Sequence, residues 1–231
     1  MTNLRNPINI LYPPEERPIE PHDTALLVID MQYLDAHPDW GIGRDAKQRG
    51  LEDALSYYWQ QVKAIVPRIR RLQESCRARK VEVIHIRIVS LTRDSRDSSR
   101  GHHLRGCLAP PGSQEAKFLE EVAPTGDEVI IAKTSSSAFG STAIDQILRN
   151  MGIRNLIACG VATSSCVEMT VRDAADRNYG VIVAHDACAA ITEELHRAAL
   201  LTMDGFMGLV QLRSTEEVLR LLDQVALAPT R

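Results

Sequence analysis

The sequence predicts an α/β protein, a three-layer αβα sandwich around a mostly parallel six-stranded sheet. Six short apolar runs recur along the chain without the polar alternation of half-exposed strands, which is typical of strands buried on both faces. They alternate with stretches in which apolar residues recur every three or four positions, as they do in helices. This alternation favours a parallel sheet covered by helices on both faces.

A single domain over residues 1–231 is expected, because no linker or internal repeat divides the chain. Residues 1–23 contain five prolines and predict an extended arm, packed on the body or on a neighbouring subunit. Pro67 lies inside the longest predicted helix and can kink it. The predicted strands are residues 24–30, 81–89, 128–133, 155–161, 179–185 and 206–212. The predicted helices are residues 51–79, 141–151, 167–178, 193–204 and 214–225.

The connection over residues 91–124 is long, polar and rich in arginine, serine, glycine and proline. Connections of this length are often functional lids. We therefore predict a lid-like insertion or a subunit contact, with a plain solvated insertion as the alternative. His102 and His103 lie on this connection and either contact a substrate or are solvated.

Composition argues against several classes of function. A hydrophobic content of 44% and a charged content of 25% are ordinary for a soluble globular protein. The net charge of −3, without any block of Lys or Arg, argues against a nucleic-acid partner. No apolar run reaches membrane-spanning length, and residues 1–23 lack the apolar core of an export signal. Five cysteines without CxxC spacing fit a reducing compartment, so a cytoplasmic protein is expected.

Three reactive side chains follow predicted strands. Asp30 ends the first strand, Lys133 ends the third, and Cys166 follows the fourth by a short loop. In open α/β sheets, ligands bind beyond the carboxyl ends of the strands. The shared position therefore predicts one site in which Asp30 takes the proton of the thiol and Lys133 favours both charged forms.

The local sequence at Cys166 adds to this hypothesis. Ser165 and Glu168 match a capping box, which makes Cys166 the first predicted residue of a helix. A thiol at that position lies among unpaired backbone N–H groups, so a lowered pKa is predicted. Its own N–H, with one from the preceding loop, can bind a developing oxyanion.

Three segments resemble the signatures of the isochorismatase-like cysteine hydrolases. They are LLVIDMQ at 26–32, AKTSSSAF at 132–139 and GVATSSC at 160–166. The resemblance covers roughly residues 22–213 and implies an isochorismatase-like fold with an acid–lysine–cysteine triad at the three residues named above.

The resemblance also implies a cis peptide bond between Val161 and Ala162. The N–H groups of Ala162 and Cys166 would then form the oxyanion hole. A cysteine at this position favours amide hydrolysis within the superfamily.

The nicotinamidases of the family carry a metal site of Asp and His near the second strand. This chain has His85 and Arg87 there, without that pair, so we predict no metal and no cofactor. The 91–124 connection and residues 139–149 look more like the ureide branch. The resemblance therefore implies an amidohydrolase that releases ammonia from a linear ureide such as biuret or triuret through a thioester, and, by analogy, a homotetramer.

Four residues are candidates for substrate binding. Gln211 lies in the last predicted strand and can both donate and accept hydrogen bonds, as a ureide requires, although neighbouring backbone can equally satisfy it. Phe139 and Trp40 are candidates for a flat wall or are ordinary packing residues. Arg87 can meet a substrate carboxylate, and Arg105 in the long connection is the alternative to it.

Other functions stay open. A carboxylated ureide such as N-carbamoylsarcosine or ureidoacrylate is the main rival substrate, and nicotinamide is another. A non-catalytic member that binds a metabolite is the alternative from a different class, although such a protein has no need of all three reactive side chains.

Overall fold

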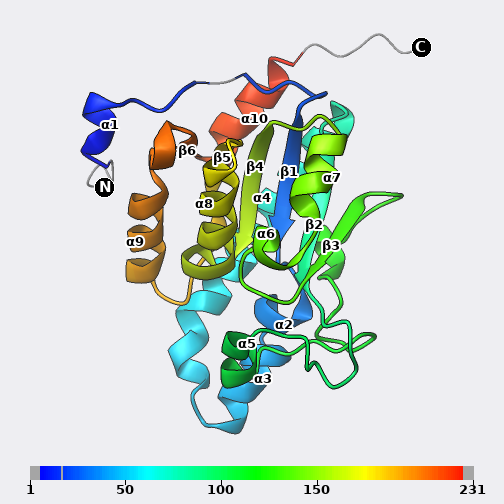
Figure 1. The fold of residues 1–231 in the computed structure, drawn as a ribbon. Helices are drawn as coiled ribbons and strands as arrows, with labels where there is room; N and C mark the ends of the chain where they lie inside the picture. Colours follow the sequence, from blue (N-terminus) through cyan, green and yellow to red (C-terminus); the bar gives the residue numbers. More distant parts are fainter. Residues whose placement is uncertain (1–5, 17, 226–231) are drawn as a thin grey trace.

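A computed structural model describes residues 6–16 and 18–225 and contains one sheet of six parallel strands (Figure 1). The strand order is β3-β2-β1-β4-β5-β6. In chain order the strands are β1 (Thr24–Ile29), β2 (Glu82–Ile88), β3 (Val129–Lys133), β4 (Asn155–Val161), β5 (Gly180–Ala189) and β6 (Val210–Arg213). The predicted parallel α/β sheet is confirmed, and every pairing between neighbouring strands is parallel.

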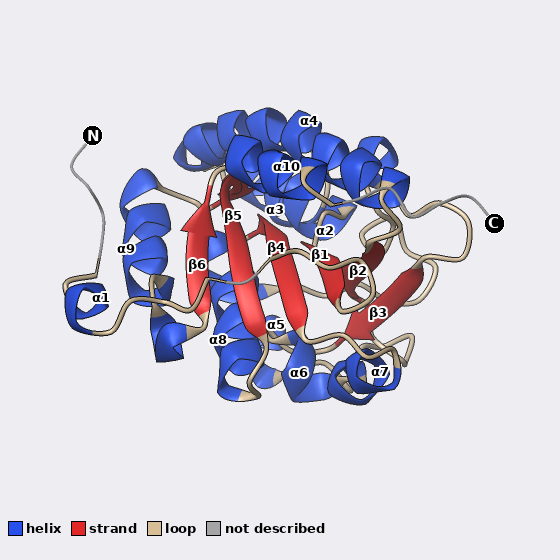
Figure 2. Cartoon of the chain, turned by 90° about the horizontal axis from the view of Figure 1, so that it is seen from above, coloured by secondary structure: helices blue, strands red, loops and turns tan. Residues whose placement is uncertain are grey.

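Helices cover both faces of the sheet, as Figure 2 shows. One face carries α4 (Ser56–Ala78) and α10 (Thr215–Asp223). The other face carries α6 (Ala138–Ser141), α7 (Ile144–Asn150), α8 (Glu168–Asp176) and α9 (Glu193–Met203). The chain therefore forms the three-layer sandwich that the sequence predicts.

The alternation of side chains along β1 explains why the sheet needs both layers. Leu27 and Ile29 pack in the apolar cluster under α6, α7 and α8, whereas Leu26 and Val28 pack in the cluster under α4 and α10. All four side chains are buried. Successive residues of a strand point to opposite faces, so an unbroken apolar run requires cover on both sides.

The short helices lie beyond the carboxyl ends of the strands (Figure 1). They are α2 (Tyr33–Ala36), α3 (Gly41–Gln48) and α5 (Arg100–Arg105). The strand order reverses direction between β1 and β4, and such a switch point is where open α/β sheets bind ligands. The remaining short elements are the helix α1 (Ile8–Leu11) and a π-helical turn (Thr163–Val167). Three 3-10 turns cover Glu52–Leu55, Glu120–Val122 and Phe206–Gly208.

Two strand boundaries differ from the sequence-based expectation. β5 runs past His185 to Ala189, because its pairing with β4 shifts register and then resumes at Gly160 and Val161. β6 begins at Val210, not at Phe206, because Met207 and Gly208 have positive φ angles of 55° and 70°. Left-handed backbone cannot continue a strand.

The arm is not wholly extended, since α1 interrupts it. Its described part packs on the body, where the Asn9 side chain and the Asn6 N–H donate to Asp204 and Ile19 is buried. Residues 1–5 and 17 lie outside the described residues. Pro67 lies within one continuous helix, and the capping box of Ser214 at the start of α10 is present.

Candidate active site

Asp30 follows β1 directly and is fully buried. Its φ angle is 52°, a left-handed conformation that Asp adopts more readily than most residues. Its N–H donates to the Ile86 carbonyl at 2.9 Å, which ties the turn to the end of β2. The buried Gln32 side chain donates to the Ile88 and Glu115 carbonyls and so joins this turn to the 91–124 connection. The position of the carboxylate is therefore set by the ends of two adjacent strands.

Lys133 is the last residue of β3, and its side chain is also fully buried. Its Nζ lies 2.9 Å from Asp30 Oδ2 and donates to the Ser135 carbonyl at 3.0 Å and to Cys166 Sγ at 3.3 Å. The ammonium group thus donates two hydrogen bonds and forms an ion pair with Asp30. Although β2 separates β3 from β1, the long lysine side chain reaches across to join the acid and the thiol.

Cys166 lies inside the π-helical turn Thr163–Val167 that precedes α8. The expected capping box is wrong, because the turn begins after Ala162 and Ser165 caps nothing. Glu168 instead accepts a hydrogen bond from Thr202 of α9. Single π-helical turns are frequent at functional sites, and this one presents the thiol to Lys133.

The approach of β4 to β1 requires glycine just before this turn. A Cβ on Gly160 would lie 2.0 Å from the Ile29 carbonyl oxygen, and the φ angle of Gly160 is 119°. The peptide bond between Val161 and Ala162, just after this glycine, is cis, as the family resemblance implies.

The expected lowering of the Cys166 pKa is wrong. Burial raises the pKa of the thiol, the Asp30 charge raises it further, and Lys133 only partly offsets this. Burial also raises the pKa of Asp30 against the opposing effect of Lys133. For Lys133, burial lowers the pKa, but the charges of Asp30 and Cys166 outweigh it and keep the ammonium protonated. The resting site therefore holds a neutral thiol beside an acid and a permanent cation.

A cavity of about 550 Å³ opens over Cys166. Its walls are mainly apolar, with a few polar side chains, which is typical of small-molecule sites. The residues that line it are Asp35, Ile42, Leu55, Tyr58, Ile88, His102, Arg105, Cys107, Ser136, Ala162, Ser164, Ser165, Cys166, Ile191 and Leu195. Both proposed oxyanion residues, Ala162 and Cys166, are among them.

The long connection supplies part of this lining through α5. His102 is buried and not solvated, and its Nδ1 has no hydrogen-bond partner among the described residues. Burial and the charge of Lys133 lower the pKa of His102 to about 4, so its imidazole is neutral at physiological pH. Arg105 lines the cavity, and within the described part of the chain its guanidinium forms no ion pair. His103, one residue away from His102, is exposed.

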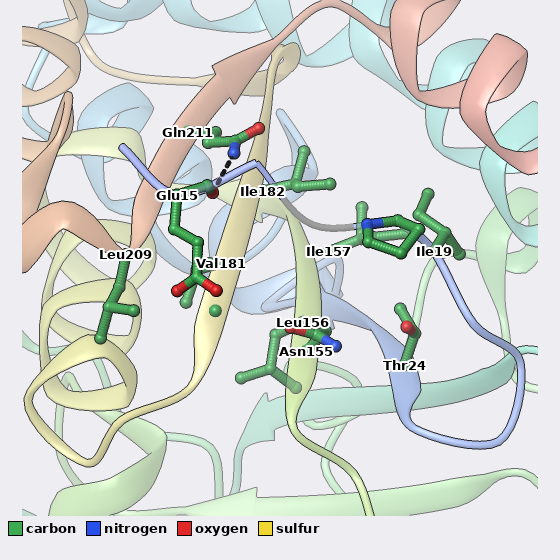
Figure 3. Close-up of a pocket in the computed structure, with 12 residues that line it drawn as sticks. Glu15, Ile19, Thr24, Asn155, Leu156, Ile157, Val181, Ile182, Leu209 and Gln211 are labelled. Carbon is green, nitrogen blue, oxygen red and sulfur yellow. Dashed lines mark hydrogen bonds between the residues drawn. The ribbon is translucent and has the colours of Figure 1, made fainter. Parts of the chain in front are cut away.

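Gln211 does not reach the cavity. It lies near the beginning of β6, whereas the site lies beyond the carboxyl ends of the strands. As Figure 3 shows, its amide donates to the Glu15 carbonyl of the arm, and it lines a separate, narrow pocket of about 20 Å³. The expectation of a ureide-binding glutamine there is wrong, because residues at the start of a parallel strand lie at the opposite edge of the sheet.

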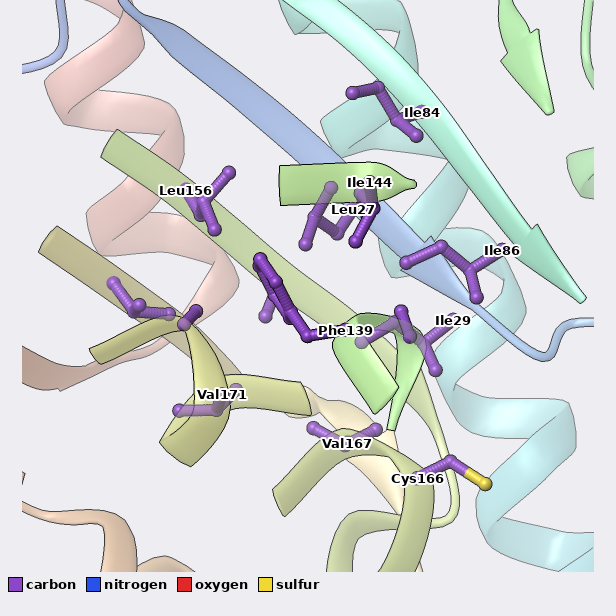
Figure 4. Packing of buried hydrophobic residues seen from close by; sticks show 14 of the residues in the cluster. Leu27, Ile29, Ile84, Ile86, Phe139, Ile144, Leu156, Cys166, Val167 and Val171 are labelled. Atoms are coloured by element: carbon purple, nitrogen blue, oxygen red, sulfur yellow. The ribbon is translucent and has the colours of Figure 1, made fainter. Parts of the chain in front are cut away.

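The other three binding candidates also lie outside the cavity lining. Phe139 is a core residue, packed among Leu27, Ile29 and their neighbours (Figure 4). Arg87 donates to the Ala116 carbonyl at 2.8 Å and lies over the Phe118 ring, so it anchors the long connection. Trp40 occupies the N-cap position of α3 without a side-chain capping bond and is 37% exposed. Ordinary packing, the second interpretation offered for Phe139, is the one that the structure supports.

No group of three or more potential metal ligands occurs among residues 6–16 and 18–225. His85, near which the nicotinamidases carry their metal, is instead buried against Glu128, with 2.9 Å between Nε2 and Oε2. Within the same residues, no helix is long and apolar enough to cross a membrane.

An acid, a lysine and a thiol that converge beyond the strands of a parallel sheet define the chain as a hydrolase of α/β architecture. The chain matches the isochorismatase domain over residues 24–216 and belongs to the isochorismatase family. This confirms the family predicted from the three sequence signatures.

Known relatives are similar over most of the chain. The ureidoacrylate amidohydrolase of Acinetobacter baylyi is 28% identical over 214 residues, which cover 85% of this chain and 83% of the relative. A cysteine hydrolase from Pseudomonas syringae pv. phaseolicola superposes with a TM-score of 0.77 at 28% identity, covering 93% of this chain and 99% of that chain. The N-carbamoylsarcosine amidase of Thermoplasma acidophilum shares the fold, with 23% identity and a TM-score of 0.66. The match covers 84% of this chain and 97% of the amidase.

Proposed function

We propose that this chain is a cysteine amidohydrolase that cleaves the terminal carbamoyl C–N bond of a small ureide and releases ammonia. The observation that carries the proposal is the Cys166 thiol at the base of a cavity, 3.3 Å from a lysine that is ion-paired with Asp30. The named activity of the ureidoacrylate amidohydrolases supports the choice of an amide bond.

Each side chain has one role in the proposed reaction. Asp30 takes the proton from Cys166 Sγ as the sulfur attacks the carbamoyl carbon. The N–H groups of Ala162 and Cys166 stabilise the resulting oxyanion. Asp30 then protonates the departing nitrogen, which leaves as ammonia, and the acyl group stays on sulfur as a thioester. Throughout, Lys133 stabilises the negative charge on Asp30 or on sulfur.

Water completes the cycle. Asp30 removes a proton from a water molecule, which attacks the thioester carbon, and the S–C bond breaks. The thiol regains its proton and the product leaves as a carbamic acid. Because the free thiol is neutral, with a pKa raised by burial, an adjacent base is needed for the first step.

We further propose that the ureide carries a carboxylate. Gln211, the reason to prefer neutral biuret or triuret, lies at the opposite edge of the sheet. Arg105 instead offers a cation to the cavity, without an ion-pair partner among the described residues. An arginine can bind a carboxylate through two parallel hydrogen bonds, and such a contact compensates the charge of N-carbamoylglycine or ureidoacrylate.

Ammonia release from a panel of substrates tests both proposals, the hydrolysis of a ureide and the preference for a carboxylated one. The panel is N-carbamoylglycine, ureidoacrylate, biuret, triuret and nicotinamide. We expect the carboxylated ureides to have the highest kcat/KM, and Arg105→Gln to lower it about tenfold or more for these alone. Arg100→Gln, an exposed arginine on the same helix, is the matched control. A higher kcat/KM for biuret or triuret would favour the neutral ureides, and activity on nicotinamide alone would refute the proposed function.

We also propose that the chain is a homo-oligomer. Leu91 and Leu104 of the long connection are 82% and 76% exposed, and a subunit contact would remove these apolar side chains from water. Light scattering measures the assembly directly, and a monomer at micromolar concentration would contradict the proposal.

A further inference from the structure

Asp35 is a carboxylate of the cavity that the reaction above does not use. It lies on α2, five residues after Asp30, and lines the cavity together with Cys166. Its backbone carbonyl accepts a hydrogen bond of 2.8 Å from the buried Tyr58 hydroxyl. This bond ties α2 to α4, so the side chain of Asp35 projects from a fixed backbone.

The Asp35 carboxylate has no hydrogen-bond donor in the described part of the chain. Its only described contacts of this kind are made by its backbone. Several other half-buried or buried carboxylates have such partners, among them Asp23, Glu115, Glu128, Asp186 and Asp204. Asp35 is half-buried and lines the cavity, so its carboxylate is open to a hydrogen-bond donor there. A donor from a bound molecule would supply the missing partner.

Asp35 interacts electrostatically with the other ionisable groups at the cavity. Burial and the charge of Asp30 raise the pKa of Asp35 to about 7. After burial, Asp35 is the next cause of the raised pKa of Cys107. It also contributes, after burial and Asp30, to the raised pKa of Cys166.

We propose that Asp35 determines specificity by accepting a hydrogen bond from the inner N–H of the ureide. The inference rests on the proposed function. With the carbamoyl carbon at Cys166, its oxygen toward Ala162 and its terminal nitrogen leaving toward Asp30, the inner N–H is the donor that remains. Arg105 binds the carboxylate beyond it.

This assignment predicts a preference between two otherwise similar substrates. N-carbamoylglycine has the inner N–H, whereas N-carbamoylsarcosine carries a methyl group in its place. Both have the same carboxylate for Arg105. A methyl group at this position leaves Asp35 without a donor and places an apolar group against it, and loss of a hydrogen bond to a charged group costs about ten- to a hundredfold in affinity.

The experiment compares kcat/KM for ammonia release from these two substrates. Wild type should favour N-carbamoylglycine by about tenfold or more. Asp35→Leu should bring the ratio close to one, and Asp35→Asn should leave an intermediate ratio because its amide oxygen can still accept. Asp39→Asn, an exposed carboxylate four residues along the chain, is the matched control and should keep the wild-type ratio.

Three results would overturn the inference. One is a wild-type ratio near one, and another is a ratio that is unchanged in both Asp35 variants. If Asp35→Leu does not fold, an unchanged ratio in Asp35→Asn suffices. A wild type that hydrolyses no ureide of either set but releases ammonia from nicotinamide overturns the proposed function and this inference together, whereas equal hydrolysis of both ureides overturns only the role of Asp35.

Discussion

Lys133 and Asp30 form an ion pair of 2.9 Å in which neither side chain is exposed to solvent. Removing one partner of such a pair leaves a buried charge uncompensated and typically costs 3–5 kcal/mol, whereas replacing both can be nearly neutral. The stability of the fold and the chemistry of the site therefore depend on the same two side chains.

This relationship predicts the outcome of a double-mutant cycle. Lys133→Met should lower the free energy of unfolding at neutral pH by about 3 kcal/mol or more. Asp30→Asn with Lys133→Met should be less destabilised than Lys133→Met alone, because the lone carboxylate is gone. Urea unfolding followed by circular dichroism measures both. Additive effects of the two substitutions would show that the pair is not coupled.

Cys166 should carry the acyl group during turnover. Acid quenching of the wild-type enzyme with substrate, followed by peptide mass analysis, should find the adduct on Cys166. Cys166→Ser should fold with an unchanged melting temperature and lose turnover by at least about a thousandfold. An adduct on Cys107, which also lines the cavity, would move the nucleophile there.

The raised pKa of Asp35 predicts a pH-dependent effect on stability. The pKa is about 7 in the folded chain and 3.8 in the reference state. Between these values the folded state binds more protons than the unfolded state, so stability falls as pH rises from about 4 to about 7 and does not recover above it.

The side chain that Asp35→Asn introduces cannot ionise, so this variant should not lose stability between about pH 4 and about pH 7. Its melting temperature relative to wild type should be higher at pH 8 than at pH 4, by on the order of 10 °C. Asp39→Asn, whose carboxylate is exposed, should lack this gain at high pH. Equal differences at both pH values for Asp35→Asn would indicate an ordinary, unburied carboxylate.

His102 should contact substrate as a neutral imidazole. Its pKa of about 4 keeps it uncharged above about pH 5, with a buried Nδ1 that has no described partner. His102→Phe should lower kcat/KM about tenfold through the loss of one hydrogen bond to the ligand. The exposed neighbour offers the comparison, because His103→Phe should leave both kcat and KM unchanged. Similar kinetics in the two variants would assign His102 to packing.

Activity should survive removal of metal ions. Within the described residues, no three potential metal ligands lie together. The Nε2 atom of His85 is already hydrogen-bonded to Glu128. Incubation with EDTA followed by gel filtration should leave the rate of ammonia release unchanged. Recovery of a lost rate on addition of zinc would contradict this expectation.

The sequence by itself determined the sheet and the convergence of three reactive side chains at one of its edges. Apolar runs without alternation specify strands buried on both faces. A residue at the carboxyl end of such a strand must lie at one edge of the sheet whatever the packing. Asp30 and Lys133 end strands in this way, and Cys166 follows one by a short loop. The convergence of the three side chains is therefore predictable from the sequence.

The tertiary structure decided which side chains complete the site and in what ionisation state. Asp35, His102 and Arg105 lie on short helices whose placement depends on packing with distant segments, and local periodicity carries no information on such contacts. Gln211 lies at the edge of the sheet opposite the site, because the left-handed turn at Met207 and Gly208 delays the start of β6 to Val210. The pKa of Cys166 is raised and not lowered because burial and the charge of Asp30, both consequences of the folded chain, outweigh the effect of Lys133.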